Sequence, residues 1–165
     1  SLRLANVYGP SPTESLAQDR GILSKITKRR FALKNLQIYG NGKYLRDYIY
    51  IDDVVNAFLH ASVMDYGILL NNNQIALNVA SGKGTSVKEV FDLISHEVEK
   101  ITGIRGDIEN VAWPEEVNEI EKRNYIGSIE LIKSLTGWKP SVSLEKGIQL
   151  LVKHHSKEGI GNEVS

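Results

Sequence analysis

The sequence predicts a protein of the α/β class, because segments with strand character alternate along the chain with segments of helical character. The clearest strand, residues 36–39, ends at a glycine-rich turn. The clearest helix begins at Ser86, where Ser86 and Glu89 have the spacing of a capping box ahead of an apolar stripe. Several strands are short and separated by turns. We therefore expect the edge of a doubly wound sheet with a smaller appended lobe.

In the first half of the chain, turn-forming residues mark where each predicted element ends. The opening strand stops at Gly9-Pro10, and the first helix turns Ile22 and Ile26 toward the core. Asp52 or Asp53 is expected to cap the second helix. The expected elements are, in order, a strand over residues 2–8, a helix over 21–31, strands over 36–39 and 48–51, and a helix after residue 52.

In the second half, Gly137 is expected to end a short helix, and Ser143 to cap the last one. Residues 156–165 are expected to form a polar tail after a single structural unit over residues 1–155. The expected elements are a strand over residues 76–80, a helix from 86 to 101, a strand near 107–112, and helices over 128–135 and from 144.

Composition excludes several classes of function. The 165 residues carry 20 basic and 20 acidic side chains, which argues against a nucleic-acid partner or a polybasic membrane surface. The chain has no cysteine, so disulfides and thiolate chemistry are excluded. The four histidines lie at spacings unsuited to a metal site, and no apolar run is long enough to span a membrane. We expect a cytoplasmic protein.

The start of the chain suggests a piece of something larger. It begins at Ser1, directly in strand-like sequence, and its only methionine is Met64. A trimmed but whole domain is one interpretation, and a cut inside a larger fold is the one we expect. The chain also lacks a glycine-rich loop with the spacing needed to hold a dinucleotide pyrophosphate. No cofactor is therefore expected to bind tightly to this chain alone.

One motif resembles a catalytic pair but is predicted to be a turn. Tyr39 and Lys43 have the Tyr-x-x-x-Lys spacing of a proton-transfer pair, which requires the two side chains to lie one helical turn apart. The residues between them are Gly40-Asn41-Gly42, which disfavour a helix. We therefore expect no catalytic residue in this chain.

The strongest candidate for a binding site surrounds Arg46. An arginine at the mouth of a strand can bind a diphosphate through two hydrogen bonds, while Tyr39 offers a flat face for a base and Tyr48 a hydroxyl. On this hypothesis Arg46 and Tyr39 face one shared pocket. In the alternative, Arg46 and Asp47 form a surface ion pair and the tyrosines are half-buried strand residues.

Five segments, taken in order, resemble the extended short-chain dehydrogenase/reductase family, and within it the NAD-dependent nucleotide-sugar epimerases and dehydratases of the UDP-glucose 4-epimerase type. The resemblance runs from about Leu2 to His154. The segments are LRLANVYGP from Leu2, IYGNG from Ile38, RDYIYIDDVV from Arg46, LNVASG with TSV from Leu77, and TGWKP with SLEKGI from Thr136.

The resemblance implies that the chain is the C-terminal, substrate-binding part of such an enzyme, without its N-terminal Rossmann NAD(P)-binding part. It implies edge strands and a small lobe that grips a UDP- or dTDP-sugar. The backbone of Leu4 would lie near the nicotinamide of the cofactor. By position, the substrate-binding residues would be Asn6, Arg20, Gly21, Gln37, Tyr39, Arg46, Tyr48 and Val87.

The same resemblance places the glycine-rich loop and the catalytic tyrosine and lysine upstream of Ser1, so the isolated chain is predicted to be inactive. The intact parent would be a homodimer. Within each subunit, the N-terminal half would be the partner of this chain. Two alternatives stay open: a non-catalytic nucleotide-sensing relative, and a dimerisation module.

The sequence also departs from the family pattern after the last predicted strand. Ser128 stands where an aspartate is common, and Leu131 where a lysine is common. A second phosphate-binding arginine is missing from its usual place. Either Arg123 or Lys122 could supply the missing charge.

Overall fold

The structure is a computed structural model that describes residues 1–10, 21–65, 67 and 76–161. It confirms the α/β class, with short strands paired two by two. The parallel pairs are β1 (Leu2–Leu4) with β6 (Leu77–Val79), β2 (Asn6–Tyr8) with β5 (Tyr48–Tyr50), and β3 (Leu36–Tyr39) with β8 (Ile108–Val111). An antiparallel pair joins β4 (Leu45–Arg46) to β7 (Thr85–Ser86).

The helices form where the sequence predicts them, with small differences at their ends. The helix α6 continues to Gly161, beyond the predicted boundary at residue 156. The helices are α1 (Ile22–Phe31), α2 (Ile51–Ser62), α4 (Val87–Thr102), the 3₁₀ helix η1 (Glu119–Lys122), α5 (Glu130–Thr136) and α6 (Leu144–Gly161).

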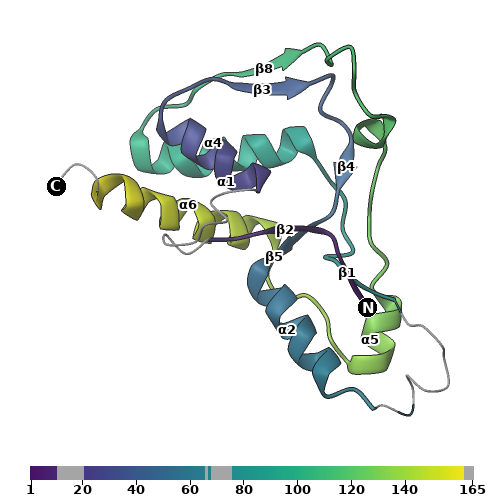
Figure 1. The fold of residues 1–165 in the computed structure, drawn as a ribbon. Coiled ribbons are helices and arrows are strands. Elements are labelled where there is room, and N and C mark those ends of the chain that lie inside the picture. Colours follow the sequence, from purple (N-terminus) through teal and green to yellow (C-terminus); the bar gives the residue numbers. More distant parts are fainter. Residues whose placement is uncertain (11–20, 66, 68–75, 162–165) are drawn as a thin grey trace.

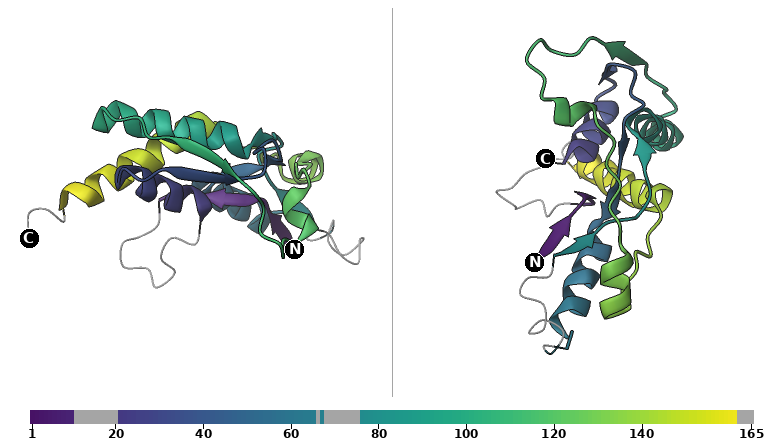
Figure 2. Two further views of the ribbon diagram at one scale, coloured as in Figure 1. Left: turned by 90° about the horizontal axis from the view of Figure 1, so that it is seen from above. Right: turned by 90° about the vertical axis from the view of Figure 1, so that its right-hand side faces the viewer.

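The chain folds into two lobes, each with its own hydrophobic core. In the upper lobe of Figure 1, α1, α4 and α6 pack together and β3 and β8 lie above them, around buried residues such as Ile94 and Leu151. In the lower lobe, α2 and α5 flank β1 and β6 around Val79 and Trp138. The pair β2–β5 runs between the lobes. Figure 2 shows the helices of the upper lobe lying beside one another in two further views.

Local sequence explains α4 completely. The Ser86 hydroxyl accepts from the Glu89 amide at 3.2 Å, and the Glu89 carboxylate accepts from the Ser86 amide at 2.8 Å, so the predicted capping box is confirmed. Val90 and Ile94 are fully buried on the predicted stripe, whereas Ile101 at its end is half exposed. Gly103 ends the helix at φ +72°, a left-handed conformation that favours glycine.

Three predictions of detail are wrong, and for two of them, the opening strand and Asp53, distant contacts decide the local structure. The opening strand breaks at Ala5, where the chain leaves β6 as its partner and joins β5. Ile22 is 55% exposed and does not pack inward. Neither Asp52 nor Asp53 caps α2, whose N-cap residue is Tyr50. Asp53 instead turns inward to receive the backbone amides of residues 141 and 142.

Candidate functional site

A cleft of about 250 Å³ lies beside the point where the opening strand changes partners. This Arg46 cleft brings together Leu4 and Asn6, which flank the break, and Arg46 at the end of β4. Its opposite wall comes from η1 and the chain that follows it. The lining residues are Leu4, Ala5, Asn6, Arg46, Ile120, Glu121, Arg123 and Tyr125.

The guanidinium of Arg46 is held in the cleft mainly by backbone carbonyls. It donates to the carbonyls of Leu45 at 3.1 Å and Glu121 at 2.6 Å, and also to that of Arg123. The Glu121 carboxylate lies 3.7 Å away but is 60% exposed, so it neutralises the charge only weakly. Arg46 is therefore a positioned cation with charge left for an anion.

Asp47 does not pair with Arg46, so the hypothesis of a surface ion pair is wrong. The Asp47 side chain is fully buried and is not among the residues that line the cleft. Its carboxylate accepts from the Ser81 amide and hydroxyl at 2.7 Å each, from the Gly82 amide at 3.0 Å, and from the Gly127 amide at 3.1 Å. Asp47 thus fixes two loops next to the strand that carries Arg46.

The structure distinguishes the two candidates for a second cation. Arg123 lines the cleft with Arg46. Lys122 instead bonds to the Glu119 carboxylate at 2.7 Å, within η1, and does not line the cleft. The 3₁₀ turn therefore places these neighbouring side chains in different surroundings.

Asn6 reinforces the junction at the floor of the cleft. Its backbone amide and its side-chain amide both donate to the Asp47 carbonyl, at 3.1 and 2.9 Å. Its carboxamide oxygen has no hydrogen-bond partner among the described residues. Asn6 thus contributes an acceptor of fixed orientation to the cleft that Arg46 and Arg123 also line, and such an acceptor suits a sugar hydroxyl.

Gln37 and Tyr39 lie on the exposed face of β3, away from the Arg46 cleft. Tyr39 is 48% exposed and stacks on Trp113, with ring centroids 5.5 Å apart and planes 22° apart. Trp113 also meets the edge of Tyr44. Tyr39 is not among the residues that line the cleft, so the structure does not bring it and Arg46 into one described cavity. The turn predicted at Gly40 and its neighbours is confirmed, because Gly40 has φ +66°.

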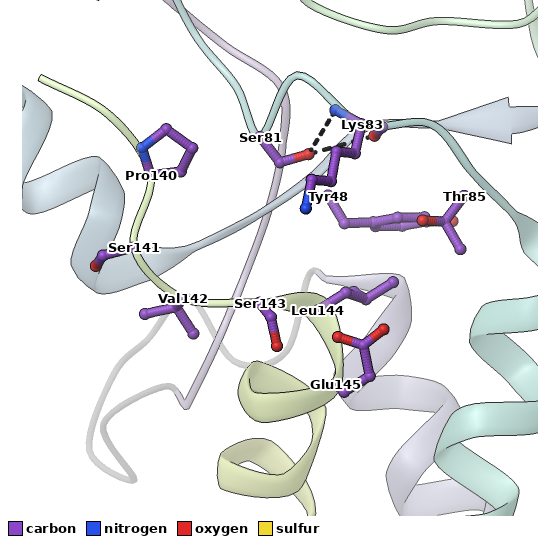
Figure 3. A pocket seen from close by; sticks show the side chains of 10 residues that line it. All are labelled: Tyr48, Ser81, Lys83, Thr85, Pro140, Ser141, Val142, Ser143, Leu144 and Glu145. Atoms are coloured by element: carbon purple, nitrogen blue, oxygen red, sulfur yellow. Dashed lines mark hydrogen bonds between the residues drawn. The ribbon is translucent and has the colours of Figure 1, made fainter.

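The other predicted residues that the structure describes, Tyr48, Val87 and Gly21, do not line the Arg46 cleft. Tyr48 is buried and lines a different cavity, between β5 and the start of α6 (Figure 3). Burial raises the pKa of Tyr48 to about 12, against the opposing effect of Arg46. Val87 begins α4 and packs on the upper core, and Gly21 is the N-cap of α1. Arg20 lies outside the described residues.

Sequence reasoning missed Tyr125 in the cleft and Trp113 beside Tyr39. Both lie in the irregular chain between β8 and α5, where no periodic pattern predicts the direction of a side chain. The missed role of Asp47 had no local signal either, because its partners are at least 34 residues away.

Within the ranges that the structure describes, no helix is long and apolar enough to cross a membrane. No group of three or more histidine, cysteine or acidic side chains in those ranges could hold a metal ion.

Comparison with known proteins decides the family. The family model described as GDP-mannose 4,6 dehydratase matches residues 1–151. The chain belongs to this family. The resemblance to UDP-glucose 4-epimerase-like enzymes is confirmed too, since a protein of Methanocaldococcus jannaschii named "Putative UDP-glucose 4-epimerase" is 33% identical over 92% of the chain.

Solved structures of the family agree with the fold. The UDP-glucose 4-epimerase of Thermotoga maritima, determined with UDP-glucose, is 32% identical, has a TM-score of 0.74 and is matched over 95% of this chain. The dTDP-glucose 4,6-dehydratase of Bacillus anthracis, determined with NAD, shares the fold at 23% identity and a TM-score of 0.65. The chain spans 43% of the archaeal relative and 45% of the Thermotoga structure, so it is about half the length of the relatives it matches.

Proposed function

We propose that this chain is the nucleotide-sugar-binding part of an NAD-dependent epimerase or dehydratase whose remaining parts lie outside these 165 residues. The observation that carries the proposal is the convergence of Arg46, Arg123 and Asn6 on one cleft. A cytoplasmic location and homodimer formation by the complete enzyme stay predictions from the sequence.

The chemistry of the cleft suits a sugar diphosphate. Two guanidinium groups provide several N–H donors and charge for phosphate oxygens, and the single carboxylate of Glu121 leaves the group net positive. The Asn6 amide would meet the sugar, and Leu4 would approach the nicotinamide. Contact of Tyr39 and Gln37 with the base stays a prediction. The segment from Trp113 to Arg123 runs from the aromatic pair to the cleft and would lie along the nucleotide.

The described residues do not fit the pyrophosphate of NAD. The loop with Gly82 and Gly84 follows β6, but the short strand β7 separates it from α4. The loop is also packed against protein, because a Cβ at Gly84 would lie 2.6 Å from the Ile126 side chain. The amides of Ser81, Gly82 and Lys83 in this loop already donate to the Asp47 carboxylate and the Ser81 hydroxyl, so NAD(P) would be held by the other half of the parent.

In such a parent, this chain would contribute to catalysis by positioning the sugar. Binding the diphosphate at Arg46 fixes the sugar at the mouth of the cleft, and the binding free energy of this remote group lowers the entropic barrier to the chemical step. The cofactor, when bound by the parent, supplies hydride transfer. Proton transfer would require residues that this chain does not contain.

Calorimetric titration with UDP tests the proposal. The chain should bind UDP saturably, and Arg46→Ala should weaken binding by about 10-fold or more, the loss of one charge-assisted contact of about 1.5–3 kcal/mol. Arg123→Ala should act in the same direction. Lys122→Ala is the matched control and should bind like wild type, because Lys122 pairs with Glu119 outside the cleft. Equal affinity of Arg46→Ala and wild type would remove Arg46 from the site.

Turnover provides a second test. Incubated with UDP-glucose and NAD, the isolated chain should convert no sugar above background. Measurable epimerisation or dehydration would show that the catalytic groups lie within these residues.

A second candidate role, association with another polypeptide, is favoured by the surface of α2. Three apolar side chains of α2 are at least half exposed, Val55, Phe58 and Leu59, and so is Val63, the C-cap residue of the helix. Within the described residues, β1 pairs on one edge only, with β6. An unpaired sheet edge presents N–H and C=O groups with which a strand of another polypeptide can pair. We propose that the N-terminal half of the parent enzyme covers this surface.

Sedimentation of the isolated chain tests that role. Newly exposed apolar surface should cause weak self-association, and Phe58→Glu should reduce it while leaving UDP binding intact. Strictly monomeric wild-type chain at high concentration would argue against the surface as an interface.

A further inference from the structure

A second cavity, here called the Tyr48 pocket, opens between the loop after β6 and the first turn of α6 (Figure 3). Its volume is about 250 Å³, and it shares no lining residue with the Arg46 cleft. The lining residues are Tyr48, Ser81, Lys83, Thr85, Pro140, Ser141, Val142, Ser143, Leu144 and Glu145.

The hydroxyl of Tyr48 points to a ligand. The side chain is only 7% exposed, yet its hydroxyl has no hydrogen-bond partner among the described residues. The hydroxyl itself is not sealed from solvent, so it opens onto the pocket, where a ligand can bond to it. In Figure 3 the ring crosses the pocket and the hydroxyl lies toward Thr85.

The charges in the pocket are balanced. Figure 3 shows Lys83 extending into the pocket from one side and the Glu145 carboxylate from the other. Ionised Glu145 would repel a phosphate or carboxylate, and Lys83 would repel an amine. The Ser81 and Ser141 hydroxyls already donate to Asp47 and Asp53, so they add little for a ligand.

The remaining surface combines hydrogen-bonding groups with apolar ones. Thr85 and Tyr48 offer hydroxyls, while Val142 and Leu144 offer aliphatic contacts. The Ser143 hydroxyl is already engaged, because it accepts from the Lys146 amide at 3.3 Å and bonds to the Glu145 carboxylate. A sugar ring has the complementary surface, because its hydroxyls both donate and accept and its C–H faces are apolar. The volume lies below the roughly 300 Å³ at which pockets begin to hold drug-sized ligands, which favours a single ring.

We propose that the Tyr48 pocket binds a neutral polyhydroxylated ligand, a single pyranose or a short polyol, at a site separate from the nucleotide-sugar cleft. Glu145 accepts from one pair of hydroxyls, Lys83 donates to another, and the Tyr48 hydroxyl donates to a third acceptor.

The test is an amide-resolved NMR titration of the 165-residue chain with methyl α-D-glucopyranoside, and separately with inorganic phosphate. The glycoside should shift the amides of residues 81–85 and 141–146 saturably, and phosphate should not. Tyr48→Phe should weaken glycoside binding by about 5-fold or more. Tyr44→Phe is the matched control, because Tyr44 lines neither cavity. Glu145→Gln, a second variant at an exposed residue, should also weaken glycoside binding, because the amide keeps only one of the two acceptor oxygens.

Each outcome decides the proposal. Shifts by phosphate at the same amides, no shifts by the glycoside, or equal affinity of Tyr48→Phe and wild type would overturn it. Arg46→Ala should lose UDP binding and keep glycoside binding, so failure of this pocket and failure of the proposed function are separable. Loss of the glycoside response in Arg46→Ala would show that only one site exists.

Discussion

Replacing Asp47 with asparagine is expected to destabilise the chain although the two side chains have nearly the same shape. Oδ1 of Asp47 accepts from the Ser81 amide and hydroxyl, and Oδ2 accepts from the Gly82 and Gly127 amides. Asparagine keeps one oxygen but places an NH₂ group against the other two donors. Two backbone N–H groups then face a donor in place of an acceptor.

The magnitude follows from those two groups. Each buried donor left without an acceptor costs about 1–3 kcal/mol. Part of this cost is offset because the variant no longer buries a charge. We therefore expect a loss of about 2–4 kcal/mol in the free energy of unfolding.

Urea denaturation, followed by far-UV circular dichroism and by the fluorescence of buried Trp138, measures the effect. Asp52→Asn is the control, since it makes the same chemical change at an exposed residue in the first turn of α2. It should cost less than about 1 kcal/mol, the size of a surface interaction with the helix dipole. If the two variants unfold at the same urea concentration, the buried acceptor role of Asp47 is refuted.

Three further predictions concern stability. Gly147→Ala should destabilise the chain by about 1–3 kcal/mol, because its Cβ would lie 2.0 Å from the Tyr8 hydroxyl oxygen. Burial raises the pKa of Tyr48 from 10.0 to about 12. The contribution of Tyr48 to the free energy of unfolding is therefore complete below pH 10.0 and is lost as pH rises toward 12. Hydrogen bonds from Ser86 lower the pKa of Glu89. The contribution of Glu89 to the free energy of unfolding is therefore present above the ordinary pKa of a glutamate and is lost as pH falls through the lowered pKa.

Each of these predictions has a direct check. The cost of Gly147→Ala should shrink in a Tyr8→Phe background, and an unchanged cost would place the clash elsewhere. Tyr48→Phe should flatten the alkaline limb of the stability–pH curve, measured by urea midpoints. Glu89→Gln should be less stable than wild type at pH 7 and equal to it once wild-type Glu89 is protonated; a constant difference would contradict the capping role of the charge.

The sequence predicts α4 well because everything that defines this helix lies inside it. Its cap, its buried stripe and its terminal Gly103 are all local signals. The break at Ala5 has no such signal, since it arises where one strand changes its partner from β6 to β5. Asp53 shows the same limit: its position suggests a helix cap, but its partners Ser141 and Val142 lie 88 and 89 residues away.

In the candidate site, too, some residues were predicted from the sequence and others depend on tertiary packing. A resemblance of short motifs selected Leu4, Asn6 and Arg46, and the structure places all three on one cleft. It could not choose between Arg123 and Lys122, because a single 3₁₀ turn determines which of these two adjacent residues lines the cleft with Arg46. Contacts made by irregular chain depend on tertiary packing, which periodicity does not encode.

The three successive residues 46–48 lie in three different surroundings. Arg46 ends β4 and faces the cleft, Tyr48 begins β5 and enters the second pocket, and Asp47 between them is buried. Strand alternation would place residues 46 and 48 on one face, but the chain changes partner from β7 to β2 at Asp47, so the faces are not continuous. Because the Asp47 carboxylate holds the backbone at this junction, Asp47→Asn should weaken ligand binding in both cavities, whereas Arg46→Ala should weaken it in the cleft alone.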